Sequence, residues 1–464
     1  MDHMIHFKYK VLSPKYLAIF SFSVFVILAI FFSSKAKNSR VKSDIRISPC
    51  KDCNVVFVSF DTLRVSNVHA YGYGKNTTPA IDAMAVKGFL FENAISVSSW
   101  TLPASMSWFT GVYPSRHKVI NKYTLSGNGK EIISDLRILS PEIKTLAEVL
   151  SENGYKTGGF TGGSGVSRIF GFDMGFDIYL DDKDFAGFEY SYPIALEWIE
   201  KNRNEKFFVF LHGYDIHGQY VPEGGYDKRF VDFEYKGRLT GSKEEQKNLR
   251  EEGLARGSLF LSDDDVRFLR ALYDEKIQRA DENFSKFLDR YNKLGLMGKT
   301  IFILTSDHGE EFYEHGQIDH GHSLYEELIH IPLIITLPQK NSKISVSGQI
   351  SSIDIYPTVL DILSIKMEGN IRNQLQGTSL VPLMEGKTTD LAAFSETDYR
   401  YAVFKRSLKD SSGWKIIKDL ESGIPELYNL SNDKLEQKNL AVKEQNIYTD
   451  LNIRLQTIID ELKK

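Results

Sequence analysis

The sequence predicts an α/β protein built around an open, mostly parallel sheet. Apolar, β-branched runs at residues 54–60, 207–211 and 301–304 have the character of strands that are buried on both faces. Each run ends in polar side chains, and longer helical patterns separate the runs. Hydrophobic residues make up 42% of the chain, which suits a large core and excludes a disordered protein.

Length and charge narrow the function classes. The 464 residues allow about two to three domains. Lys and Arg number 57 against 61 Asp and Glu, which gives a net charge of −4. This near balance offers no electrostatic argument for nucleic-acid binding.

The N-terminal region has the pattern of a membrane segment. After a short tail at residues 1–15, residues 16–33 contain an uncharged apolar run, near the short end of the about 17–25 residues that span a bilayer. We expect a single-pass anchor, a tether over residues 34–52, and a following domain outside the cytoplasm, periplasmic or at the cell surface. The small-x-small site at residues 34–36 leaves a cleaved signal peptide as the alternative. Basic residues on both sides leave the topology open.

The two cysteines, Cys50 and Cys53, lie at the entrance to the predicted domain. A structural zinc site would need further Cys or His ligands nearby, and none follows in the sequence. A small disulfide and two free thiols are equally consistent with this spacing.

The first strand and the first helices follow in order. Asp61 stands directly after the strand at residues 54–60. Residues 79–87 predict a short helix with Pro at its first turn, and a second helix opens near Thr101, with Pro103 at an early position. The start of this helix favours an anion, and a hydroxyl beside a metal there would attack an ester. The alternative is that Thr101 only caps the helix.

The middle of the chain continues the alternation of helices and strands. Residues 143–153 predict an amphipathic helix and residues 156–161 a strand. The loop at residues 162–165 lacks the Gly-Lys-Ser/Thr ending of a phosphate loop, so we expect a flexible connection. The strand at residues 207–211 ends in a second polar tip, whose members are His212, Asp215 and His217. His217 would bond a substrate oxygen or give a proton to a leaving group.

A third strand tip would complete a metal site with the first. Residues 223–260 are charged and irregular, and we expect a surface excursion there; residues 262–293 predict a long helix with a capping signal at its start. The strand at residues 301–304 then leads to Asp307 and His308. Strand ends meet at one edge of a parallel sheet, so a carboxylate and an imidazole would join the first tip around a metal.

The remaining elements are a polar loop and a smaller C-terminal unit. Beyond the proposed metal ligands, the loop at residues 309–324 holds three histidines and several carboxylates; among them are Glu310, Glu311, His315, Asp319, His320 and His322. Residues 329–337 predict a strand and residues 354–363 a helix. From about residue 390 the pattern indicates a small sheet capped by a final helix.

Motifs in a fixed order carry a family resemblance. They are DTLR (61–64), YGY (71–73), WTLP (100–103), TGVYP (110–114) with Arg116 and His117, DHGE (307–310), HGHSLYE (320–326), ELYNL (426–430) and NLA (439–441). Each motif is weak alone, but the ordered set resembles the sulfatase family of the alkaline-phosphatase superfamily over about residues 53–445.

The resemblance implies a fold, a metal and a set of site residues. It implies a three-layer sandwich around a mostly parallel sheet (residues 53–389, the catalytic domain) and a C-terminal subdomain (residues 390–464). One divalent metal ion would be held by Asp61, Thr101, Asp307 and His308, with Thr101 as nucleophile and His217 and His320 on the transferred group or leaving oxygen. We expect further substrate contacts from Arg116, His117, His212 and His322. A histidine ligand favours zinc or manganese over calcium or magnesium.

The sequence also departs from the family pattern. Characterised sulfatases have a cysteine, matured to formylglycine, at the position of Thr101, and an arginine at the position of Ser105. They also usually have an acid at Thr62 and a Lys-x-His pair near Gly162. Formylglycine cannot form from threonine. A threonine nucleophile is instead similar to that of phosphoethanolamine transferases and lipoteichoic acid synthase.

These observations leave three hypotheses. The first is a membrane-anchored, metal-dependent sulfatase-family hydrolase of sulfate or phosphate esters. The second is a transferase of the phosphoethanolamine or phosphoglycerol type that modifies surface glycans. The third is a surface binding protein without catalysis. The expected partner is a sulfated or phosphorylated glycan or a lipid-linked substrate at the membrane.

Overall fold

The computed structural model describes residues 45–120, 124–125, 131–132, 138–221, 229–232, 234–338, 342–367, 369–400 and 402–463. The chain divides into two compact units, Met1–Arg46 and Ile47–Lys464, and the second unit holds every element below. The predicted tail, the anchor at residues 16–33 and most of the tether lie outside the described residues. Among the helices that are described, none combines the length and apolar character needed to cross a bilayer.

The centre of the second unit is an eight-stranded sheet with the order β12-β2-β11-β8-β1-β7-β5-β6. Its strands are β1 (Asn54–Phe60), β2 (Phe89–Ile95), β5 (Lys156–Phe160), β6 (Ile178–Leu180), β7 (Phe207–Gly213), β8 (Thr300–Ser306), β11 (His330–Thr336) and β12 (Ile344–Ser351). Only β11 runs antiparallel to its neighbours, β2 and β8; the other pairings are parallel. The predicted mostly parallel sheet is confirmed.

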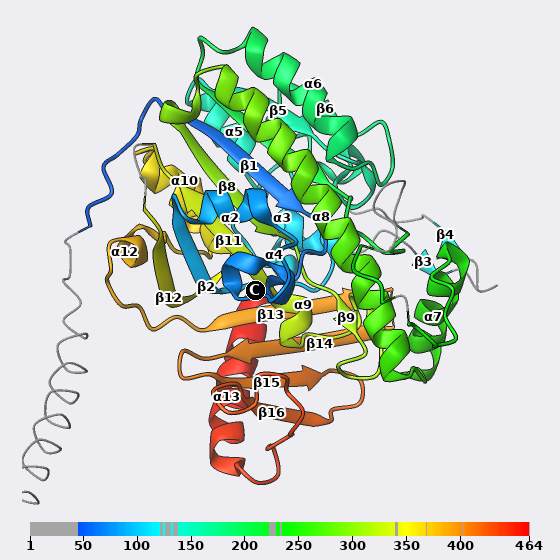
Figure 1. The fold of residues 1–464 in the computed structure, drawn as a ribbon. Coiled ribbons are helices and arrows are strands. Elements are labelled where there is room, and N and C mark those ends of the chain that lie inside the picture. Colours follow the sequence, from blue (N-terminus) through cyan, green and yellow to red (C-terminus); the bar gives the residue numbers. More distant parts are fainter. Residues whose placement is uncertain are drawn as a thin grey trace, which may run out of the picture. The chain divides into compact units, whose positions relative to one another are not determined.

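Helices cover both faces of this sheet (Figure 1). One face packs against α2 (Pro79–Ala85), α6 (Phe188–Lys201) and α8 (Asp263–Lys293), and α3 (Thr101–Thr110), α5 (Leu146–Glu152) and α10 (Ile355–Ile362) form the other helical layer. Side chains alternate accordingly: Val56 and Phe60 join the α8 side, and the Phe57 ring lies 5.3 Å from that of Trp108 on α3. The sheet is therefore the middle of three layers.

Local signals explain where the predicted helices begin. The Ser262 side chain accepts a hydrogen bond from the backbone of Asp265, which starts α8 as the sequence predicts. Thr145 caps α5 in the same way, so this helix starts three residues later than predicted. The remaining helices are α4 (Pro114–His117), α7 (Lys243–Arg256), α9 (Glu326–Ile329), α11 (Asn370–Gln374), α12 (Val381–Met384) and six 3-10 turns, η1 (Val65–Asn67), η2 (His69–Tyr71), η3 (Ser164–Val166), η4 (Arg168–Phe170), η5 (Met297–Lys299) and η6 (Ser352–Asp354).

A second sheet forms the C-terminal subdomain. Its antiparallel strands are β13 (Ala393–Tyr399), β14 (Val403–Lys409), β15 (Trp414–Asp419) and β16 (Pro425–Asn429). The last helix, α13 (Gln445–Leu462), packs on it through buried residues such as Leu451 and Leu455. Two short hairpins, β3 (Thr124–Leu125) with β4 (Glu131–Ile132) and β9 (Glu311–Phe312) with β10 (Ile318–Asp319), complete the strands. The predicted small C-terminal sheet with its helix is confirmed.

The structure adds a helix, a closely packed loop and a disulfide to what the sequence predicts. The excursion at residues 223–260 was predicted to be irregular, but it contains α7, which Ser242 caps. The loop at residues 162–165 was predicted to be a flexible connection; in the structure it is closely packed, because a Cβ atom on Gly162 would lie 2.1 Å from the carbonyl oxygen of Ala186. Cys50 and Cys53 form a disulfide, which resolves the alternative left open above.

Candidate active site

Three neighbouring strands deliver polar side chains to one edge of the large sheet. Strand β1 lies between β7 and β8, with Phe60 opposite Gly213 on one side and Ser306 on the other. The residues that follow, Asp61 and Asp307, therefore leave the sheet at the same level. The ligand atoms of Asp61, Asp307 and His308 all lie within 4.8 Å of one another and are buried. The structure thus brings together the three predicted metal ligands from the strand ends.

Thr101 joins this cluster from the first turn of α3. Its Oγ1 atom lies 3.1 Å from Asp61 Oδ2 and 3.3 Å from His308 Nε2. The residue before it, Trp100, occupies the N-cap position, and no side chain caps this helix. Thr101 is therefore not the N-cap residue of α3, and its hydroxyl is directed at the carboxylate of Asp61 and the imidazole of His308.

Backbone groups orient the cluster. The N–H groups of Thr62 and His308 both donate to Asp307 Oδ1, at 3.1 and 2.9 Å. His308 Nδ1 lies 2.8 Å from the carbonyl oxygen of Gly309. A carbonyl only accepts, so Nδ1 carries the proton and the lone pair of Nε2 faces Thr101.

Burial dominates the electrostatics of the site. It raises the pKa of Asp61 well above its ordinary value, and the neighbouring charge of Asp307 adds to the increase. Behind Asp61, burial lowers the pKa of His212 to about 4, and this histidine is therefore neutral. His212 Nε2 lies 3.7 Å from Asp61 Oδ2. Two facing carboxylates in a dry site call for a compensating positive charge.

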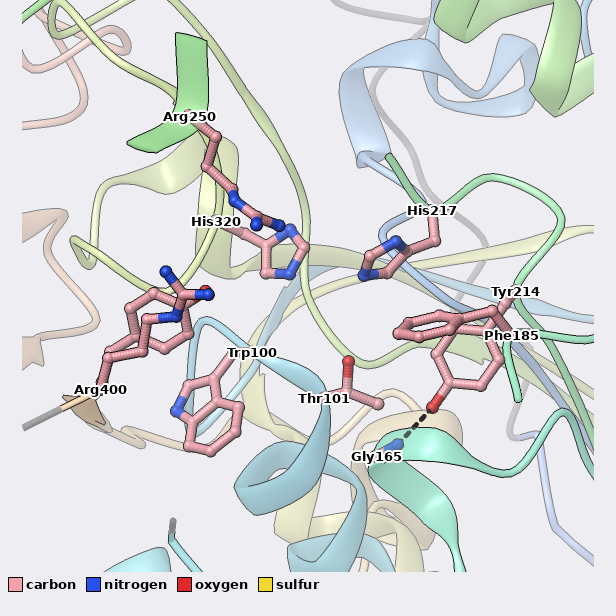
Figure 2. Close-up of a pocket in the computed structure, with 10 residues that line it drawn as sticks. Trp100, Thr101, Gly165, Phe185, Tyr214, His217, Arg250, His320 and Arg400 are labelled. Atoms are coloured by element: carbon pink, nitrogen blue, oxygen red, sulfur yellow. Dashed lines mark hydrogen bonds between the residues drawn. The ribbon is translucent and has the colours of Figure 1, made fainter. Parts of the chain in front are cut away.

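A pocket of about 200 Å³ opens beside Thr101 (Figure 2). Its walls carry aromatic and basic side chains; they are Trp100, Thr101, Gly165, Phe185, Tyr214, His217, Arg250, His320, Tyr399 and Arg400. The rings of His217 and His320 lie 5.2 Å apart. His320 Nδ1 lies 2.9 Å from Glu310 Oε1 and 3.1 Å from Asp319 Oδ1, which leaves Nε2 for the pocket.

Several of these pocket residues carried no local signal in the sequence. Arg250 belongs to α7 and Arg400 follows β13, so both reach the pocket from segments without a recognisable motif. Gly165 comes from the loop expected to be a flexible connection. A Cβ atom there would lie 3.0 Å from both Cβ and Cγ2 of Thr101, so only glycine leaves the threonine room at this contact.

Four predicted substrate contacts are not among the residues that line the pocket. Arg116 and His117 follow α3 at the end opposite Thr101, about 15 Å along a ten-residue helix. His117 turns inward to Ser107 Oγ at 3.1 Å, and His322 pairs with Glu311 at 2.7 Å. The fourth residue, His212, is fully buried beside Asp61. The structure thus places these four side chains outside the lining of the pocket, with His212 still 3.7 Å from Asp61.

Comparisons with known proteins agree with this architecture. The profile described as Sulfatase matches residues 53–365, and the one described as N-sulphoglucosamine sulphohydrolase, C-terminal, matches residues 313–464. Arylsulfatase K of Danio rerio is 32% identical over 207 residues, which cover 43% of this chain and 39% of that protein. The human arylsulfatase K is 32% identical over 210 residues, covering 42% and 38%. The chain thus spans about two fifths of the length of these relatives.

Solved structures share the fold at low sequence identity. The phosphonate monoester hydrolase of Agrobacterium radiobacter superimposes with a TM-score of 0.67 at 18% identity, covering 88% of this chain and 96% of that chain. A protein solved in complex with its substrate D-glucosamine-2-N,6-O-disulfate has a TM-score of 0.67 at 20% identity, covering 89% and 97%. With a family profile matched over most of its length, the chain belongs to the sulfatase family.

Proposed function

We propose that this protein is a metal-dependent hydrolase of sulfate or phosphate esters with Thr101 as its nucleophile. The observation that carries the proposal is the position of the Thr101 hydroxyl. It lies in the pocket wall, 3.1 Å from the Asp61 carboxylate and 3.3 Å from the His308 imidazole. This arrangement places one attacking oxygen between a buried acid and an open cavity.

The donor atoms fit a divalent cation. Within the described part of the chain, Asp61 Oδ1 and Asp307 Oδ2 are buried without a hydrogen-bond partner, which is costly unless another group compensates them. Together with His308 Nε2 and the Thr101 hydroxyl they form an oxygen-rich set with one nitrogen. Such a set favours zinc or manganese, with calcium or magnesium as the alternatives. A bound cation would lower the pKa of the hydroxyl and neutralise charge on the transferred group.

The protein's own side chains perform the remaining steps. Asp61 accepts the hydrogen bond of the Thr101 hydroxyl and thereby fixes the direction of its oxygen. A bond forms between this oxygen and the sulfur or phosphorus atom as the hydroxyl proton passes to Asp61, while the bond to the ester oxygen breaks. His217 or His320, which face each other across the pocket, gives a proton to the departing oxygen. Water then attacks the same sulfur or phosphorus atom, and the histidine that gave up its proton takes one from this water. Asp61 returns its proton to the Thr101 oxygen as the bond to the transferred group breaks.

The substrate is proposed from the relatives. Arylsulfatase K and a structural neighbour solved with a disulfated glucosamine support a sulfated sugar. The structural neighbour named as a phosphonate monoester hydrolase supports phosphorus esters as further candidate substrates. A transferase would use the same attack on Thr101 but release the group to a glycan hydroxyl in place of water, and labelled phospholipid with an acceptor glycan would detect that product.

A panel of esters tests the proposal. Aryl sulfates, phosphate monoesters, phosphodiesters and phosphonates are assayed with added Mn, Zn, Ca and Mg, and the protein is analysed for bound elements. We expect turnover of at least one ester class and its loss by at least about 10³-fold in Thr101→Ala. Thr110→Ala removes the same atoms at the other end of α3, where the hydroxyl donates to the carbonyl oxygen of Met106, and should keep activity. Full turnover by Thr101→Ala would refute the mechanism, whereas no turnover and no bound metal would favour a binding protein.

The location in the cell is also a proposal. The apolar run at residues 16–33 would anchor the protein or direct its export, and a disulfide between Cys50 and Cys53 fits an oxidising compartment outside the cytoplasm. Fractionation of cells before and after an alkaline wash checks the anchor. Release of the protein by the wash alone would argue against it.

A further inference from the structure

Two arginines reach the pocket from elements that do not carry the strand-end site. Arg250 lies on α7, and Arg400 directly follows β13 of the C-terminal subdomain. Figure 2 shows both guanidinium groups on the side of His320, across the pocket from Phe185. The wall that they form is thus built separately from the metal ligands.

A single carboxylate joins the two arginines. Arg250 Nη2 lies 2.8 Å from Glu251 Oε1, and Arg400 Nη1 lies 3.2 Å from Glu251 Oε2. The side chain of Glu251 is 46% exposed, whereas those of Arg250 and Arg400 are 16% and 22% exposed. The positive groups are therefore more deeply placed than the carboxylate that bridges them.

The second acid near Arg250 is already engaged. Asp319 Oδ2 lies 3.7 Å from Arg250 Nη1, beyond hydrogen-bond distance, while Asp319 Oδ1 lies 3.1 Å from His320 Nδ1. Arg250 therefore meets Glu251 through Nε and Nη2, and the contact of its Nη1 with a described carboxylate is the longer one to Asp319. The Nη1 group of Arg250 can therefore donate a hydrogen bond to an anion in the pocket.

The chemistry of these side chains selects the ligand. Planar guanidinium groups bind carboxylate, sulfate and phosphate oxygens through paired hydrogen bonds, and a partly desolvated setting strengthens them. We infer that Arg250 and Arg400 form a subsite for a second anionic group, a carboxylate, sulfate or phosphate, carried by the leaving part of the ester. The inference rests on the proposed function for the position of the ester at Thr101, and it adds that the preferred substrates are at least doubly anionic.

Matched substrates separate this role from others. Ortho- and meta-carboxyphenyl esters of the transferred group are compared with the corresponding carboxamides, which have nearly the same shape but no second charge. In Arg250→Met and Arg400→Met, kcat/KM for a carboxylated ester should fall about ten- to hundredfold more than for its carboxamide, the range for one hydrogen bond to a charged group. Arg256→Met changes the same charge on the same helix, where Arg256 pairs with Glu252 outside the pocket, and should leave the preference unchanged.

A binding measurement keeps the inference independent of turnover. The same esters are titrated calorimetrically into full-length Thr101→Ala protein with and without the arginine substitutions. Tighter binding of the carboxylated ester that disappears with Arg250→Met supports the subsite even if the wild-type protein hydrolyses neither ester, a result that would defeat only the proposed function. Equal losses on both esters would mean that the arginines hold the transferred group or merely join α7 to the C-terminal subdomain. Either equal losses or no loss overturns the inference.

Discussion

Gly165 and Thr101 are packed so closely that one added methyl group should displace the proposed nucleophile. A Cβ atom on Gly165 would lie 3.0 Å from both Cβ and Cγ2 of Thr101 and 3.3 Å from the hydroxyl of Tyr214. Carbon atoms in good contact lie about 3.5–4.0 Å apart, so Thr101 must move by about 0.5 Å. Since a misplacement of about 1 Å costs about 10²-fold in rate, Gly165→Ala should lower kcat/KM about tenfold.

A double-mutant cycle tests the cause of this loss. Thr101→Ser removes the Cγ2 atom and with it one of the two close contacts, so the hydroxyl should return part of the way towards Asp61 in the Gly165→Ala background. We expect a favourable coupling of about 0.5–3 kcal/mol between the two substitutions, measured from kcat/KM on the best ester. Gly74→Ala is the control, because nothing lies within 4 Å of a Cβ atom there. Activity of Gly165→Ala within twofold of wild type, or strictly additive effects, would refute the reasoning.

Three further predictions concern stability. Burial raises the pKa of Glu314, but its salt bridge to Arg64 at 2.7 Å is the main reason that the pKa is instead lowered to about 2 from 4.5. Glu314→Gln should therefore lower the free energy of unfolding at pH 7 by about 3 kcal/mol, and urea titrations should show the difference vanishing as pH falls from 4.5 towards 2. Burial lowers the pKa of His315, but its bond to Glu327 outweighs this and raises the pKa to about 9. The stabilisation from the protonated His315 is complete below pH 6.5 and is lost as pH rises through 9. The Tm of the wild-type protein should therefore fall over that pH range, whereas the Tm of Glu327→Gln should not. Leu455→Ala, at a fully buried position under the C-terminal sheet, should cost about 2–5 kcal/mol by calorimetry with kcat unchanged.

The sequence predicts the centre of the fold better than its edges. Strands β1, β7 and β8 are continuous apolar runs, since both of their faces are covered, and such runs are visible without tertiary information. Strand β2 includes the exposed Glu92, and in β12 serines alternate with apolar residues. Neither sequence therefore resembles a strand that is buried on both faces. Helix α7 is polar on nearly every face, and no apolar period reveals it.

The same distinction applies to the candidate site. Asp61, Asp307 and His308 were predictable because strand ends of a parallel sheet meet at one edge. Arg250 and Arg400 were not, because their place depends on how α7 and the C-terminal subdomain pack around the pocket, which no local pattern encodes. His117 and His322 are placed differently: both bond partners inside the protein, as buried imidazoles commonly do, and neither lines the pocket.

The adjacency of β1 and β8 has a consequence for how the protein folds. The bond from the Thr62 N–H to Asp307 joins residues 245 positions apart, so the proposed cation site can form only after β1 and β8 have paired over this long separation. Chain segments with local contacts, such as the long helix α8, would form early. During refolding, metal capture should consequently lag behind the recovery of helical circular dichroism and mark the completion of the native topology.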